Sequence, residues 1–217
     1  MSKTKILIVD DHRVVIEGIR SALRDHPEFE AVGEAFNGQG AVEQTKALRP
    51  DIVIMDISMP NLNGIDATLQ IKQFASDIRI IIFTMYSNRE YVVDLFKAGI
   101  SAYVLKEDPM SDLILAIEAV KAGGTYFSSK APTILLSHIK ELEEGKIKRD
   151  DYENLSLRER EVFLLLAEGK PIKEIAEKLY ISRKTVESHK YNIMGKLHVE
   201  TITDLTKIAI RKNLIQL

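Results

Sequence analysis

Residues 52–64 read IVIMDISMPNLNG, a short apolar run that ends at Asp56 and continues into a polar loop. Four apolar residues followed by turn-forming residues are typical of a strand buried on both faces of a parallel sheet. Two further runs of this kind, Ile6–Val9 and Ile80–Phe83, also end at polar residues. Two weaker strand candidates complete the set of five: Glu30–Ala35 and Ala102–Leu105.

Stretches with apolar residues at helical spacing alternate with these strands. They are Val14–Leu23, Ala41–Leu48, Ile65–Phe74, Tyr91–Ala98 and Leu113–Ala122. Strict alternation of strand and helix predicts βαβ units, and Gly123-Gly124 then stops the last helix. We therefore expect an α/β domain over residues 1–125 with a doubly wound, five-stranded parallel sheet.

The remainder of the chain has a different character. Residues 126–153 predict a linker with one short helix, Thr133–Leu142, followed by the polar run EEGKIKRDDYEN. Ser156 to Glu159 form a capping-box sequence that opens a helix ending near Gly169. Three more helical patterns follow, so residues 154–217 predict a small all-α domain of four helices.

Composition limits the function classes that this chain can belong to. Of 217 residues, 45% are apolar and 29% are charged, and the net charge is −2. The chain has no cysteine, which excludes disulfide scaffolds, Cys-ligated zinc and thiolate nucleophiles. Charge divides along the predicted boundaries, with −5 in residues 1–125, −1 in 126–153 and +4 in 154–217. An acidic domain followed by a basic one favours metal or phosphate chemistry in the first and nucleic acid binding in the second.

The longest unbroken apolar run, Val162–Ala167, is far shorter than the ~18 residues of a membrane span. The N-terminal residues MSKTKILIVDD turn acidic where a signal peptide would be apolar. We expect a cytoplasmic protein without a membrane partner.

Polar residues follow four of the predicted strands at the point where each strand ends. Asp10 and Asp11 follow the first strand, Asp56 the third, Thr84 the fourth and Lys106 the fifth. The carboxyl ends of parallel strands meet at one edge of a sheet, so these side chains converge if the fold is right. Three close carboxylates require a counter-charge, which Mg²⁺ (or Mn²⁺) and the lysine supply. A carboxylate held beside both cations can attack phosphorus, so the pattern predicts an aspartyl-phosphate site.

This pattern resembles the receiver domain of two-component response regulators over the whole of residues 1–125. The spacings of 46, 28 and 22 residues that separate Asp10, Asp56, Thr84 and Lys106 fit such a domain. The resemblance implies that Asp56 accepts a phosphoryl group from the phosphohistidine of a sensor kinase and that Lys106 holds a phosphoryl oxygen. It further implies the Mg²⁺ ligands: Asp11, Asp56 and the backbone carbonyl of Ser58, with Asp10 acting through water.

The resemblance also implies a switch. Thr84 and Tyr103 would form the switch pair, in which the hydroxyl moves to the phosphate and the ring turns inward. Ser58 and Tyr86 occupy positions that tune the dephosphorylation rate in the family. One departure concerns Lys106, which many receivers follow directly with proline. Here the sequence continues Glu107-Asp108-Pro109, so we expect no cis peptide bond at the lysine.

The basic C-terminal domain contains a helix-turn-helix pattern. The turn lies within KLYISRKT, residues 178–185, and apolar residues on both sides would pack the two helices together. The second helix of the pair then presents polar residues outward. Residues 155–199, beginning LSLREREVFLLLAEGK, resemble the LuxR-type DNA-binding domain, and the whole chain resembles the NarL/FixJ family of response regulators.

By that resemblance the second helix of the pair enters the DNA major groove. Glu187, Ser188 and Tyr191 would face bases. The expected phosphate contacts are Arg183, Lys184, Lys190 and Lys196. Family members commonly carry lysine where this chain has Glu187. That carboxylate can accept a hydrogen bond from a cytosine amino group or repel other sequences, and both interpretations stay open.

The leading hypothesis is a phosphorylation-controlled transcription factor. Phosphorylation of Asp56 would bias a two-state equilibrium and favour a homodimer that binds operator DNA. The expected partners are a sensor histidine kinase and double-stranded DNA, with RNA polymerase as a further candidate. Two alternatives remain open: a Mg²⁺-dependent phosphohydrolase with an aspartyl nucleophile, and a phosphorylation-gated protein-interaction module that does not bind DNA.

Overall fold

The computed structural model describes residues 3–87, 89–128, 131–143, 151–212 and 214–215. These residues form two compact units, which are residues 1–143 (the N-terminal unit) and 144–217 (the C-terminal unit). Among the described residues, no helix combines the length and apolar character needed to cross a membrane. The predicted polar linker runs partly outside the described residues, at 144–150.

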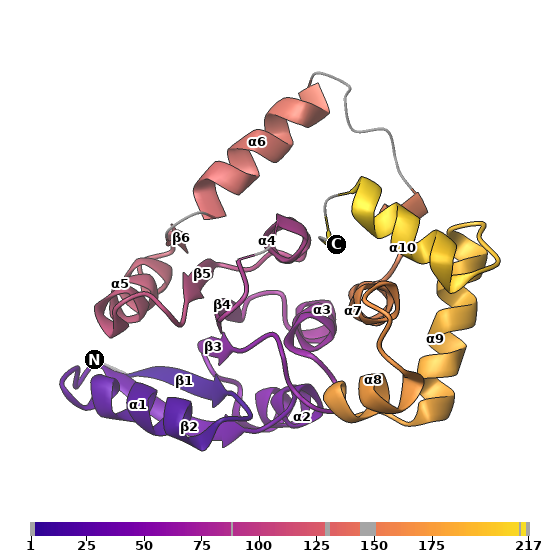
Figure 1. Cartoon of the computed structure of the whole chain (residues 1–217). Coiled ribbons are helices and arrows are strands. Elements are labelled where there is room, and N and C mark those ends of the chain that lie inside the picture. The colour runs from indigo at the N-terminus through magenta and orange to yellow at the C-terminus, as the bar shows by residue number, and fades with distance from the viewer. Residues whose placement is uncertain (1–2, 88, 129–130, 144–150, 213, 216–217) are drawn as a thin grey trace. The chain divides into compact units, whose positions relative to one another are not determined.

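The N-terminal unit is a parallel sheet with helices on both faces (Figure 1). Strand order is β2-β1-β3-β4-β5-β6. The strands are β1 (Thr4–Val9), β2 (Phe29–Ala35), β3 (Ile52–Met55), β4 (Arg79–Thr84), β5 (Ala102–Leu105) and β6 (Tyr126–Phe127). The helices are α1 (Arg13–Arg24), α2 (Gly38–Leu48), α3 (Gly64–Phe74), α4 (Arg89–Lys97), α5 (Met110–Lys121) and α6 (Ala131–Glu143). The predicted doubly wound α/β fold is confirmed.

The sheet has six strands, which corrects the prediction of five. The sixth, β6, pairs in parallel with β5 through Ala102 opposite Tyr126 and Tyr103 opposite Phe127. It comprises two residues only, which is too short for an apolar period to appear in the sequence. The Gly-Gly pair before it was interpreted as a helix stop, and the Gly124 N–H does cap α5 by donating to the Ala119 carbonyl at 2.9 Å.

Burial of the central strands positions the functional edge of the sheet. All four residues of β3 and all four of β5 are buried, as expected for strands covered on both faces. On one face, Ile8, Ile54 and Ile81 pack against apolar residues of α1 and α5. Helices α2, α3 and α4 lie on the opposite face (Figure 1). The strand ends are therefore held rigidly, which fixes the direction of the residues that follow them.

The C-terminal unit is helical throughout its described residues. It begins with a short 3₁₀ helix, η1 (Asp151–Asn154), which precedes α7 (Leu157–Ala167), α8 (Ile172–Lys178), α9 (Arg183–Lys196) and α10 (Ile202–Arg211). The predicted capping box is present: Ser156 Oγ accepts from the Glu159 N–H, and Glu159 Oε2 accepts from the Ser156 N–H. Ser182 and Thr201 cap α9 and α10 by accepting from the N–H groups of Thr185 and Asp204. A single core, which includes Phe163, joins the helices.

Candidate functional site

The polar residues predicted at the ends of four strands lie at one edge of the sheet. Strand pairing aligns Val9 with Met55 and Thr84 with Leu105, so that the residues after these strands emerge together. Lys106 Nζ lies 2.6 Å from Asp10 Oδ2 and 2.9 Å from Asp56 Oδ2. Asp10 is 1% exposed and Asp56 is 5% exposed. The edge therefore holds a buried pair of carboxylates that share one ammonium group.

Burial and charge act against each other in this site. Burial raises the pKa of Asp56, and the Asp10 carboxylate raises it further, while Lys106 and the Ile57 N–H oppose the shift without cancelling it. Burial by itself would lower the pKa of Lys106, but the carboxylates of Asp56 and Asp10 raise it overall. The lysine is therefore a fixed positive charge. Asp56 is a carboxylate whose ionised form is only partly compensated.

Asp11 and His12 extend the site toward α1. Ligand atoms of Asp10, Asp11, His12 and Asp56 all lie within 4.8 Å of one another, and the three aspartates form what we call the acidic cluster. Asp11 Oδ1 is buried and accepts no hydrogen bond. A buried carboxylate oxygen without a hydrogen bond, beside other carboxylates, fits a hard divalent cation, which takes oxygen ligands. The residues present thus fit the cation that the sequence predicts.

The loop after Asp56 is held close to the acidic cluster by a glycine. Gly64 donates its N–H to the Ile57 carbonyl at 2.8 Å. A Cβ at Gly64 would lie 1.8 Å from the Asp56 carbonyl oxygen, so no other residue fits at this position. Asn63 caps α3 by accepting from the N–H groups of Ile65 and Asp66. Ser58 is exposed within this loop.

Thr84 and Tyr103 are both buried and are linked through Tyr86. The Tyr86 N–H donates to Thr84 Oγ1 at 3.4 Å, and the Tyr103 hydroxyl donates to the Tyr86 carbonyl at 2.7 Å. The Tyr86 ring meets the ring of Tyr91 on α4 edge to face, with centroids 5.3 Å apart. A displacement of Thr84 would therefore change the contacts that Tyr86 makes with Tyr103 and with α4.

Sequence reasoning missed two residues that hold the loop after Lys106. Asp108 Oδ2 accepts from the Leu105 N–H at 3.2 Å and also from the Ser128 hydroxyl. The peptide bonds of this loop are trans. The sequence signal that could have indicated these contacts is the absence of proline directly after Lys106. Without a proline there, side chains must hold the loop in place. Ser128 directly follows β6, so the missing strand concealed this contact.

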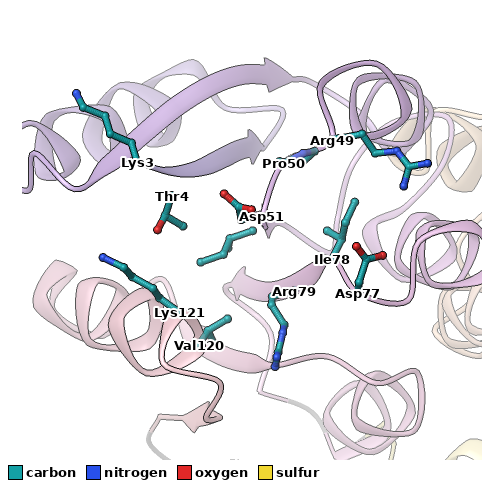
Figure 2. A pocket seen from close by; sticks show the side chains of 11 residues that line it. Lys3, Thr4, Arg49, Pro50, Asp51, Asp77, Ile78, Arg79, Val120 and Lys121 are labelled. Carbon is teal, nitrogen blue, oxygen red and sulfur yellow. The ribbon is translucent and has the colours of Figure 1, made fainter. Parts of the chain in front are cut away.

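A hollow at the opposite edge of the sheet contains none of the predicted site residues. Figure 2 shows its lining, which includes Arg49, Asp51, Arg79 and Lys121. Asp51 Oδ2 accepts a hydrogen bond from the Lys5 N–H at 2.7 Å. Arg49 and Lys121 lie at the carboxyl ends of α2 and α5, where positive side chains complement the partial negative charge of the helix. The hollow is explained by the structural roles of its lining residues.

The second site is the outer surface of α9. Val186 and Ile193 are buried against the other helices of the unit. Of the predicted DNA contacts, Arg183, Lys184, Glu187, Ser188 and Tyr191 are exposed, and Lys190 is half-buried. Tyr191 is the most prominent apolar side chain of this surface at 73% exposure.

Lys196 differs from the other predicted contacts because it is engaged within the unit. Its Nζ lies 2.6 Å from Glu159 Oε2, and the Glu159 side chain is 5% exposed. Burial would raise the pKa of Glu159, but the hydrogen bonds from Lys196 and Ser156 lower it overall. Arg158 provides a second connection by donating to the Leu179 carbonyl just before the turn. These contacts hold α9 and the turn against the start of α7.

The fold and both sites define a response regulator. The family described as "Response regulator receiver domain" matches residues 6–118, and "Bacterial regulatory proteins, luxR family" matches residues 153–209. The chain therefore belongs to the NarL/FixJ family of two-component response regulators, and it combines a receiver with a LuxR-type DNA-binding domain.

Particular relatives span almost the whole chain. "Oxygen regulatory protein NreC" of Staphylococcus epidermidis is 38% identical over 216 residues, covering 98% of this chain and 99% of that protein. "Transcriptional regulatory protein DegU" of Brevibacillus brevis is 34% identical over 227 residues, covering 99% and 96%. A structure of RcsB from Salmonella enterica serovar Typhimurium, bound to a promoter in the presence of phosphomimetic BeF₃⁻, shares 31% identity. It covers 95% of this chain and 97% of that chain, with a TM-score of 0.61. The family is one of transcription regulators rather than metabolic enzymes, and the hydrolase alternative finds no support among these relatives.

Proposed function

We propose that a sensor histidine kinase phosphorylates Asp56 and that this modification controls dimerisation and sequence-specific DNA binding. The observation that carries the proposal is the buried Asp56 carboxylate, bonded to Lys106 beside Asp10 on a receiver fold. The proposed division of labour is a receiver at residues 1–125, a linker at 126–153 and a DNA-binding domain at 154–217. A DNA target supports a cytoplasmic location.

The proposed chemistry is transfer of a phosphoryl group between a histidine and a carboxylate. An oxygen of Asp56 attacks phosphorus, the bond between phosphorus and the histidine nitrogen breaks, and that nitrogen keeps the electron pair. Asp56 lies where such an attack needs no proton to be removed, because its carboxylate can be ionised beside Lys106. The ammonium group of Lys106 then pairs with a phosphoryl oxygen, and Thr84 donates its hydroxyl to another.

Mg²⁺ (or Mn²⁺) would be held by Asp11, Asp56 and the backbone carbonyl of Ser58, with Asp10 acting through water. Support comes from the acidic cluster and from the buried Asp11 Oδ1 that accepts no hydrogen bond. When bound, the cation offsets negative charge on the carboxylates and on the incoming phosphoryl group. Lys106 supplies a further positive charge, with its Nζ 2.9 Å from Asp56 Oδ2.

We propose that the switch passes from Thr84 to α6. The contacts that support this route run through Tyr86 to Tyr103 and to Tyr91 on α4. Arg89 on the same helix donates to both carboxylate oxygens of Glu141 on α6. A repacked α4 would therefore alter the hold on α6, the element that leads toward the linker. Population shift of this kind requires two packed arrangements, which phosphorylation biases.

The proposed DNA contacts lie on α9. Glu187, Ser188 and Tyr191 would face bases, and Arg183, Lys184 and Lys190 would neutralise phosphates. Lys196 would have to divide its ammonium group between a phosphate and Glu159. Each phosphate contact contributes about 0.9 to the slope of log affinity against log salt concentration. The relatives include RcsB bound to promoter DNA, which favours DNA over the alternative of a protein-interaction module.

The first test is the intact mass after incubation with acetyl phosphate and Mg²⁺. Wild type should gain one phosphoryl group, and Asp56→Asn should gain none. Asp77→Asn is the matched control, since Asp77 is an exposed aspartate at the other edge of the sheet and should leave the gain intact. Phosphorylated wild type should then dimerise and bind genomic fragments more tightly than the unmodified protein. Equal dimerisation and binding by Asp56→Asn would contradict the proposed switch.

A further inference from the structure

His12 occupies the N-cap position of α1 but does not cap the helix. Its side chain makes no capping hydrogen bond. Its Nδ1 instead lies 2.8 Å from Asp11 Oδ1 and 3.3 Å from Asp10 Oδ1. The ring is 69% exposed, so burial does not force it toward these carboxylates. The usual reason for a polar residue at a helix start is thus absent here, and the ring nitrogen instead faces the acidic cluster.

The position of this nitrogen completes a mixed set of ligands. Nδ1 of His12 and one carboxylate oxygen each from Asp10, Asp11 and Asp56 lie within 4.8 Å of one another. Lys106 pairs with Asp10 and Asp56. Asp11 Oδ1 accepts no hydrogen bond even though the His12 nitrogen is adjacent. A cation between Asp11 and His12 would satisfy that oxygen and would bring the imidazole into the ligand set.

The identity of the fourth ligand determines which cations bind best. Mg²⁺ demands oxygen ligands in a strict octahedron and seldom takes nitrogen, whereas imidazole suits transition metals. We propose that His12 is a ligand of the divalent cation in the receiver site and shifts its preference from Mg²⁺ toward Mn²⁺. This inference rests on the proposed function, because it concerns the same cation site. It assigns a specificity role to a residue at the start of α1.

The direct test is pulsed electron paramagnetic resonance of Mn²⁺ bound to the full-length protein. Nitrogen coupled directly to Mn²⁺ modulates the electron spin echo, and ¹⁵N-histidine labelling identifies the source of the modulation. Wild type should show one bound imidazole, and His12→Gln should show none. His198→Gln is the matched control, because His198 is exposed in the C-terminal unit and belongs to no cluster of candidate metal ligands among the described residues. Its nitrogen modulation should equal that of wild type.

Affinity gives a second and independent readout. Titration with each metal alone should show that His12→Gln weakens Mn²⁺ binding by about 10-fold, as expected when a donor to a metal site is lost. Mg²⁺ binding should change by less than about 2-fold, because that ion uses oxygen ligands. The ratio of the two affinities is the informative quantity, since a general disturbance of the site would weaken both metals equally.

Three outcomes would overturn the inference: wild type without nitrogen modulation, modulation that persists in His12→Gln, or an affinity ratio that does not change. None of them affects the phosphorylation of Asp56, which the intact mass reports separately with Mg²⁺. A site that takes up phosphate and binds Mn²⁺ through oxygen alone would refute only the role of His12. Failure of wild type to bind either metal or to gain a phosphoryl group would refute the proposed function as well.

Discussion

Two carboxylates, one in each unit, have similar partners and opposite pKa shifts. Asp56 is 5% exposed and lies 2.9 Å from Lys106, and Glu159 is 4% exposed and lies 2.6 Å from Lys196. Each also accepts one backbone N–H at 2.7 Å. The pKa of Asp56 is nevertheless raised and that of Glu159 is lowered. Burial and a lysine partner alone do not decide which form of a carboxylate is favoured.

The difference lies in how each lysine is shared. Lys106 is divided between Asp56 and the neighbouring Asp10, whose like charge adds to the effect of burial. Glu159 has the ammonium group of Lys196, which is 42% exposed to water, and it closes a capping box at the start of a helix. The negative charge of the Asp56 carboxylate is thus only partly compensated and is available for chemistry. The Glu159 carboxylate instead holds α7 and α9 together. One residue is held at a cost in stability and the other contributes stability.

The largest expected effect comes from removal of the Glu159 carboxylate, which joins the start of α7 to α9 through Lys196. Glu159→Ala breaks the capping box and the pair with Lys196, and we expect it to destabilise the C-terminal unit by about 2 kcal/mol. This expected loss of stability is smaller than that for a fully buried ion pair, because water screens the charge of Lys196. Hydrogen exchange of the full-length protein should show lost protection in α7 and α9, with no change in the sheet. Unchanged protection of α7 would refute the contrast with Asp56.

The opposite sign is expected at the acidic site. In the presence of EDTA, Asp56→Asn removes a buried carboxylate whose pKa is raised in the folded protein, so that folding disfavours its ionised form, and the N-terminal unit should gain about 1 kcal/mol. The measurement is thermal unfolding, monitored through the hydrogen exchange of the backbone amides in the sheet. Asp77→Asn, at an exposed position, serves as the control and should change little. A loss of stability in Asp56→Asn would mean that Lys106 fully compensates Asp56.

A pH titration separates the two carboxylates further. The pKa of Glu159 in the folded state lies below its ordinary value of 4.5, so its contribution to stability is present above that pH. The contribution is lost as the pH falls through the depressed pKa. Exchange protection of α7 should therefore decline in acid more steeply in wild type than in Glu159→Gln. Parallel declines in the two proteins would show that other groups dominate the acid response.

The sequence predicted most of what these experiments address, for physical reasons that differ between the units. Asp10, Asp56 and Lys106 could be placed together because parallel strands align their carboxyl ends. The capping box at Ser156 could be predicted because its partners are three residues apart. The pair of Glu159 with Lys196 could not be predicted, because it joins residues 37 positions apart through helix packing. Ser128 was missed for a related reason, since β6 is too short to have a pattern of its own.

The smallest expected effect concerns strain in the turn between α8 and α9. Tyr180 has φ of +53° and is 64% exposed, so its side chain contributes little burial while its Cβ opposes the left-handed backbone. Tyr180→Gly should stabilise the C-terminal unit by about 0.5 kcal/mol, because relief of strain exceeds the added freedom of the unfolded chain. Tyr180→Ala keeps the Cβ and should give no gain. Equal stability of the glycine and alanine variants in hydrogen exchange would show that the turn is unstrained.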